Sequence, residues 1–167
     1  MELDKIKFIL DSDTFIRAKR THYPFDFAMP FWNALIQYGK EGIICSIDKV
    51  YNEITEGNDE LSEWIISFKE SIILTETNEI ISNYSKLINW VGQNAQYNQN
   101  AKDEFYDSER ADAWLLATAL TYNKTIVTHE VFNGSITKRV PIPNVCKEFN
   151  IQYIDIYQML RELNFTF

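Results

Sequence analysis

The sequence predicts an α/β fold in which helices pack on a short, largely parallel sheet. Apolar runs of three or four residues alternate along the chain with longer segments of helical hydrophobic spacing. Parallel sheets with helical crossovers require this order. Apolar residues make up 46% and aromatic residues 14% of the 167-residue chain, so a sizeable core can form.

Short apolar segments bounded by polar residues are the expected strands. They are residues 7–10, 42–45, 72–74, 125–127 and 152–154. Residues 72–74 fit a strand or the end of the preceding helix, because so short an apolar run suits both. Right-handed crossovers place the carboxyl ends of parallel strands at one edge of the sheet, where α/β proteins bind ligands.

Helices are expected between these strands, where apolar residues recur every three or four positions. The expected helices span residues 29–38, 47–54, 61–71, 78–96, 112–122, 144–149 and 156–163. Pro30 suits a first helical turn, and Gly39 suits a position beyond the end of that helix. Ser46 suits the N-cap of the next helix.

The chain is expected to form one domain over residues 1–167, since its length suits a single core. Residues 57–102 contain no catalytic spacing and are expected to form a helical elaboration that shapes a cleft. Within it, the polar residues 97–102 are expected to be a loop.

Composition narrows the class of protein. A net charge of −8 argues against a surface that coats nucleic acid, although an acidic metal site in a nuclease would itself add negative charge. No apolar run approaches the ~20 residues of a membrane span, and the N-terminus lacks the cleavage pattern of a signal peptide. Cys45 and Cys146 have no metal-ligand spacing, so we expect a cytoplasmic protein.

The most informative acid is Asp112, which precedes Leu115 and Leu116 by three and four residues and shares their apolar stripe. A carboxylate on an apolar face is costly unless a partner neutralises or binds it. A helix-start aspartate favoured by the macrodipole explains the position equally well.

Other acids fall at the same predicted edge. Asp11 and Asp13 follow the first strand, Glu53 lies in the helix after the second, and Thr128 and Glu130 follow residues 125–127. Asp11 and Asp13 could instead form a helix cap or turn. A cluster of these acids would repel itself unless a cation such as Mg²⁺ or Mn²⁺ were bound. His129 lies beside the cluster but has no predicted partner, which favours a structural role.

Basic and aromatic residues are mixed in residues 15–27, a composition that suits single-stranded nucleic acid. The candidate phosphate-binding residues are Arg17, Lys19 and Arg20, together with Lys138 and Arg139 from the loop after Glu130. A solvated loop held down by its aromatic residues explains residues 15–27 equally well.

Four segments resemble the acidic motifs of PIN-domain nucleases in order and spacing. They are FILDSD at residues 8–13, VYNEI at 50–54, ADAWLLATA at 111–119 and IVTHE at 126–130. The C-terminal run VPIPNVCKEFNIQYIDIYQMLREL resembles a PIN-like branch of unassigned function.

The resemblance implies a three-layer α/β/α fold and metal-assisted hydrolysis of phosphodiesters by an endoribonuclease. The implied ligands of Mg²⁺ or Mn²⁺ are Asp11, Glu53, Asp112 and Glu130, assisted by Asp13 and Thr128. Glu130 stands where many members have aspartate, so its longer side chain could bind through water or only one metal. The resemblance also implies an RNA substrate and a toxin–antitoxin pair with an antitoxin protein as partner, and it allows a homodimer.

Two other interpretations of the acidic residues are open. Asp11-Ser12-Asp13 also resembles the start of haloacid dehalogenase-like phosphatases, but that motif requires Thr or Val where this chain has Phe15. No later paired aspartates follow a glycine as that family requires. The other alternative is a PIN-like binding module without turnover, although the presence of all four acids gives no sign of lost catalysis.

Overall fold

The computed structural model describes residues 3–74 and 77–167 and confirms the predicted α/β fold with a parallel central sheet. Within these residues the sheet has five strands, in the spatial order β3-β2-β1-β4-β5, and every neighbouring pair is parallel. The strands are β1 (Phe8–Leu10), β2 (Ile44–Ile47), β3 (Ile73–Leu74), β4 (Thr125–Val127) and β5 (Tyr153–Ile154).

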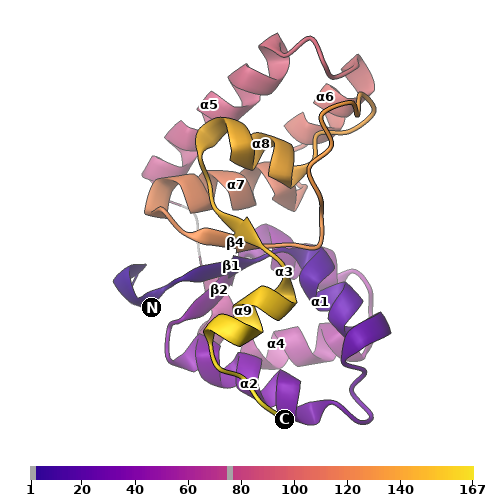
Figure 1. The fold of residues 1–167 in the computed structure, drawn as a ribbon, viewed down its shortest axis with the longest axis vertical. Helices are drawn as coiled ribbons and strands as arrows, with labels where there is room; N and C mark the ends of the chain where they lie inside the picture. Colours follow the sequence, from indigo (N-terminus) through magenta and orange to yellow (C-terminus); the bar gives the residue numbers. More distant parts are fainter. Residues whose placement is uncertain (1–2, 75–76) are drawn as a thin grey trace.

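Helices form a layer on each side of this sheet (Figure 1). The helices are α1 (Ser12–Arg17), α2 (Met29–Lys40), α3 (Asp48–Thr55), α4 (Glu60–Ile72), α5 (Asn78–Gln93), α6 (Gln99–Tyr106), α7 (Ala111–Tyr122), α8 (Ile142–Phe149) and α9 (Ile156–Glu162), with a 3₁₀ turn at Leu3–Lys5 and a π-helical turn at Ala18–His22. Helices α5, α7 and α8 lie on one side of the sheet, and α2, α4 and α9 lie on the other. No helix in the described part of the chain is long and apolar enough to cross a membrane.

Helix α7 is the central helix of its layer. Its residues Leu115 and Leu116 are fully buried, as are Ile9 and Leu10 of the neighbouring strand β1. Because α7 is apolar nearly all round, it must be covered on several sides, and it packs against α5, α8 and the sheet. Asp112 therefore lies in the first turn of a buried helix.

The strand order reverses between β1 and β4. Strands β2 and β3 extend the sheet from one side of β1, and β4 and β5 extend it from the other. The crevice at the carboxyl ends of the two strands beside such a reversal is where open α/β sheets bind ligands. Asp11 follows β1 at this point, and its backbone N–H donates to the carbonyl of Val127 at the end of β4, at 3.0 Å.

Two local predictions were wrong, one in the second strand and one in the helical elaboration at residues 57–102. Ser46 does not cap α3; it lies inside β2, where its hydroxyl donates to the Leu10 carbonyl at 2.6 Å. Residues 97–102 are not a loop, because α6 begins at Gln99 and is capped by the Asn98 side chain. The signal for α6 was the spacing of Tyr97, Ala101 and Phe105, which are all buried.

Gly39 also departs from its predicted place, because it lies inside α2 and not beyond its end. A Cβ at Gly39 would lie 2.7 Å from Cγ1 of Ile72 and 3.0 Å from the Ser71 carbonyl oxygen. The helix and the segment leading into β3 thus approach each other more closely than a side chain permits.

We predict that Gly39→Ala lowers the free energy of unfolding by about 1–3 kcal/mol, the usual cost of overpacking. The measurement is urea denaturation. Gly92→Ala is the matched control, since its Cβ would meet only the hydroxyl end of the Tyr106 side chain, which can move. That helical substitution should be neutral or stabilising by up to about 1 kcal/mol, and equal effects at the two sites would contradict the close approach.

Candidate acidic site

A cavity of about 620 Å³ opens at the strand-order reversal and collects all five acids that the sequence singled out. We call it the acidic cavity. Its charged lining consists of Asp11, Asp13, Glu53, Asp112, Glu130, Arg17, Arg110 and Arg139. The acids come from the ends of β1 and β4 and from helices α1, α3 and α7. Segments far apart in the sequence thus meet at the edge where parallel strands end.

Asp11 is the most buried of these acids, with only 3% of its surface exposed. Although it is the N-cap residue of α1, its carboxylate accepts no backbone N–H of that helix. The carboxylate instead accepts the Thr128 hydroxyl at 2.9 Å and the Ser12 hydroxyl at 3.4 Å. Asp11 therefore does not act as the helix cap that its sequence position also allowed.

Glu53 and Asp112 are joined through the start of α7. The Glu53 carboxylate accepts the backbone N–H of Ala111 at 2.9 Å, which satisfies one of the free donors of that helix terminus. Asp112 follows directly, and within the described residues its carboxylate makes no hydrogen bond or ion pair. Glu53 thus holds the turn of backbone that carries Asp112.

Burial and mutual repulsion raise the pKa values of two of these carboxyls. The pKa of Asp11 rises to about 7, mainly through burial and also through the charge of Asp112, while the Thr128 hydrogen bond opposes the rise. The pKa of Asp112 rises to about 6, through burial and the charge of Glu53, with Arg110 and Arg139 opposing. Both carboxylates are therefore short of positive partners.

Glu130 is better compensated than the other acids. One carboxylate oxygen pairs with the Arg139 guanidinium, and the other accepts the backbone N–H of Ile142 at 2.7 Å. Its own N–H donates to the Thr128 hydroxyl at 3.2 Å. Thr128 is buried behind Asp11 and does not line the cavity, so it connects the Asp11 carboxylate to the Glu130 backbone.

The predicted cations divide into those that reach the cavity and those that do not. Arg17 and Arg139 line it, and Arg17 pairs with Asp13 at 2.8 Å. Lys138 lines an adjoining cavity. Lys19 pairs with Asp59 at 2.6 Å, and neither Lys19 nor the exposed Arg20 lines the acidic cavity.

Arg110 is a lining residue that the sequence analysis did not identify. It is the N-cap residue of α7 and pairs with Glu104 of α6 at 3.0 Å. Its position two residues before Asp112, at the start of the same helix, was a signal that could have drawn attention to it.

His129 contacts aromatic neighbours, as a structural residue would. Its ring lies 5.5 Å from that of His22 and 6.5 Å from that of Tyr157, between centroids. The Tyr157 hydroxyl is 2.7 Å from Nδ1 of His22. Burial lowers the pKa of His129 and so favours the neutral ring. The ring contacts with Tyr157 connect α9 to the segment after β4.

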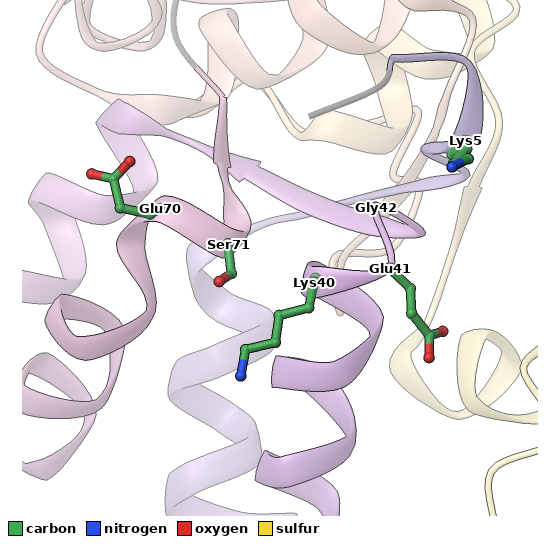
Figure 2. A pocket seen from close by; sticks show the side chains of 7 residues that line it. Lys5, Lys40, Glu41, Gly42, Glu70 and Ser71 are labelled. Atoms are coloured by element: carbon green, nitrogen blue, oxygen red, sulfur yellow. The ribbon is translucent and has the colours of Figure 1, made fainter.

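Among residues 3–74 and 77–167, no three Asp, Glu, His or Cys side chains lie close enough together to hold a metal ion as they stand. A further cavity, of about 520 Å³, lies at the opposite edge of the sheet, beside residues that precede β1, β2 and β3. Figure 2 shows that its acids, Glu41 and Glu70, point away from each other. Of these two cavities, only the acidic cavity at the strand-order reversal brings its acids together.

One family model matches the chain, over residues 8–167, and is described as "Domain of unknown function (DUF4411)". A comparison with curated protein sequences finds no match. The family match covers both the strands and the helices that surround the acidic cavity.

Solved structures show the same fold. VapBC2 from Rickettsia felis, bound to a DNA fragment from its promoter, aligns with a TM-score of 0.56 and 16% identity, over 90% of this chain and 98% of that chain. VapBC-1 from nontypeable Haemophilus influenzae has a TM-score of 0.51 and 15% identity, with the same coverage. DNA-bound VapBC from Salmonella typhimurium has a TM-score of 0.51 and 13% identity, again over 90% and 98%. These likenesses confirm the predicted resemblance to PIN domains at the level of the fold.

The raised pKa values predict how stability changes with pH in the presence of a chelator. In the unfolded chain the two aspartates release their protons above the ordinary pKa of 3.8. In the folded protein Asp11 and Asp112 keep their protons to higher pH, because their pKa values are raised. Their stabilising contribution is complete below about pH 4 and is lost as pH rises through about 6 and 7.

Asp112→Asn should therefore gain stability relative to the wild type as pH rises from about 4 to about 7, since an amide cannot ionise. Urea denaturation across this range, with EDTA present, measures the difference. Asp26→Asn, at an exposed position outside the acidic cavity, is the control and should run parallel to the wild type. A difference for Asp112→Asn that is independent of pH would contradict the proposed repulsion.

Proposed function

We propose that this chain, which belongs to the DUF4411 family and has a PIN-like fold, is a metal-dependent endoribonuclease that acts as a single domain. The observation that carries the proposal is the meeting of Asp11, Glu53 and Asp112 in one cavity at the switch point. A fold tolerates buried, mutually repelling carboxylates where they serve chemistry. A neighbouring cavity that shares Glu53 is also lined by acids, but its other acids, Glu56, Asp107 and Glu109, are exposed.

The chemistry of the lining fits a divalent cation. Mg²⁺ and Mn²⁺ prefer carboxylate oxygens, and the cavity offers five carboxylates from five segments. The raised pKa values of Asp11 and Asp112 mark the two groups with the greatest deficit of positive charge. When bound, such a cation supplies a Lewis acid that stabilises the charge developing on phosphoryl oxygens.

The residues of this chain would hold that cation in distinct ways. Asp11 and Asp112 would be the principal ligands, because no cationic side chain of residues 3–74 and 77–167 contacts either carboxylate. Thr128 orients the Asp11 carboxylate, and Glu53 both contributes charge and fixes the backbone of α7. Glu130 belongs to the set through its remaining lone pairs, since Arg139 and Ile142 already occupy its oxygens.

Asp13 and Arg17 are suited to substrate binding at the entrance. Their ion pair is partly exposed, with 54% of the Arg17 side chain and 33% of the Asp13 side chain accessible. An exposed pair contributes only about 0–1 kcal/mol, so Arg17 can exchange Asp13 for a phosphate at little cost. Lys19 and Arg20 lie on the π-helical turn that follows and would bind more distant phosphates.

The structural neighbours support a biological setting. They are VapBC complexes, so we infer that this chain is the toxin of a toxin–antitoxin pair and has an antitoxin protein as its partner. RNA is the substrate and the cytoplasm is the place of action in this proposal, and assembly as a homodimer is compatible with it. The alternative is a PIN-like module that binds its partner without turnover.

We predict that Mn²⁺ raises the melting temperature of the protein. A ligand at a hundred times its Kd stabilises by about 2.7 kcal/mol when it binds only the folded state, which corresponds to roughly 5–10 °C for a chain of this size. Thermal melting monitored by circular dichroism measures the shift. Asp112→Asn should lose most of it and Asp26→Asn should keep it; an unchanged melting temperature in the wild type would remove the metal from the proposal.

Asp11→Asn and Asp112→Asn should each lower RNA cleavage by more than about a hundred-fold, the scale on which one charge-stabilising group matters. Asp13→Asn should do less harm, because its amide can still hydrogen-bond. Gel assays of labelled single-stranded RNA with Mn²⁺ measure the rates. Wild-type protein that binds Mn²⁺ and RNA but cleaves no RNA would favour the non-catalytic module.

A further inference from the structure

A second cavity adjoins the acidic cavity and is lined by residues of different chemistry. It has a volume of about 380 Å³ and lies between α6, the start of α7 and residues 136–140. Four residues line both cavities: Arg110, Asp112, Ile136 and Arg139. The two spaces are therefore contiguous, with Asp112 and two guanidinium groups at the boundary. We call the second space the α6 cavity.

Three cations, the two acids Glu104 and Asp112, and an apolar surface are combined in the lining of the α6 cavity. Arg110, Lys138 and Arg139 are exposed cations of its lining, whereas Phe105 and Val140 are 5% and 4% exposed and form a buried apolar wall. Cations at the mouth and an aromatic and aliphatic wall behind them match the two parts of a nucleotide. The phosphate needs the charge, and the base needs an apolar surface.

Arg110, one of the two arginines at the boundary of the cavities, is available to a ligand. Arg110 pairs with Glu104, and 48% and 47% of their side chains are accessible. Such exposed pairs contribute about 0–1 kcal/mol, so a phosphate can replace Glu104 without a large penalty. Arginine also binds phosphate with two parallel hydrogen bonds, which fixes the orientation of the ligand.

We propose that the α6 cavity binds the nucleotide next to the scissile phosphodiester, with Arg110 and Lys138 on its phosphate and the Phe105 wall facing its base. This subsite rests on the proposed nuclease function, which places the scissile phosphate in the acidic cavity. A volume near the lower end of ligand sites, about 300–1,000 Å³, suits one nucleotide. The subsite makes α6 part of the substrate-binding surface.

Affinity for RNA tests the subsite separately from cleavage. The ligand is a labelled short single-stranded RNA, and fluorescence anisotropy is measured in Mn²⁺ with Asp11→Asn as the background. Asp11 lines only the acidic cavity. Adding Lys138→Gln or Arg110→Gln should weaken binding about two- to five-fold at low salt. Each should also lower the slope of log Kd against log salt concentration by about 0.7.

Lys102→Gln is the matched control. Lys102 lies on the same helix α6 and carries the same charge, but it bonds to the Gly92 carbonyl and lines neither cavity. It should leave the affinity and the salt slope nearly unchanged. Melting temperatures close to that of the background protein will show that each variant folds.

Cleavage assays in the otherwise wild-type chain separate the subsite from the nuclease function. Lys138→Gln and Arg110→Gln should both raise KM for RNA. Lys138→Gln should leave hydrolysis of bis(p-nitrophenyl) phosphate unchanged, because Lys138 lines only the α6 cavity and that small diester does not need it, whereas Arg110 lines both cavities. If both diester and RNA are cleaved and the two variants behave like Lys102→Gln, the subsite is wrong and the nuclease stands. If neither is cleaved but RNA affinity still depends on Lys138 and Arg110, the α6 cavity binds a nucleotide of RNA and the nuclease is wrong.

A protein ligand is the competing occupant of the α6 cavity, since a partner's carboxylate would also satisfy Arg110 and Lys138. RNA affinity that is insensitive to both substitutions would overturn the nucleotide subsite and leave the cavity to such an acidic partner.

Discussion

The buried carboxylate of Asp11 is the constraint on which the rest of the structure depends. It lies where β1 ends beside β4, and its only side-chain donors among the described residues are the hydroxyls of Thr128 and, at 3.4 Å, Ser12. Neutral hydroxyl donors do not repay the desolvation of a charge, so the pKa of Asp11 rises. The pairing of β1 with β4 nevertheless fixes its backbone, and the structure holds a group that would otherwise be expelled to solvent.

The same acids that crowd the cavity also anchor its helices. Glu53 accepts the first N–H of α7, and Glu130 accepts the first N–H of α8. The residues immediately before those helices, Arg110 and Pro141, provide no side-chain cap. Free N–H groups at a helix start attract negative charge, so acids from distant segments replace the local caps. The cavity and the packing of two helices are consequently one structure.

Sequence reasoning succeeded where a single rule sufficed and failed where contacts between segments decided the outcome. Placing strand ends at one edge brought Asp11, Asp112 and Glu130 together correctly, because the topology alone determines that edge. Ser46 was misassigned because its hydroxyl donates to the Leu10 carbonyl of the neighbouring strand β1 and does not accept an N–H at the start of α3. Periodicity also could not show that Lys19 would reach Asp59 and turn away from the cavity.

The charge balance of the acidic cavity explains how a chain of net charge −8 can present arginines to a polyanion. Of the described residues, five acids and three arginines line the cavity, an excess of two negative charges when all are ionised. One divalent cation would offset that excess. Arg17 and Arg139, which now neutralise Asp13 and Glu130, would then face a cavity that no longer needs them. Metal and phosphate binding should therefore reinforce each other. A cation on the carboxylates frees the arginines for phosphate, and phosphate on the arginines frees the carboxylates for the cation.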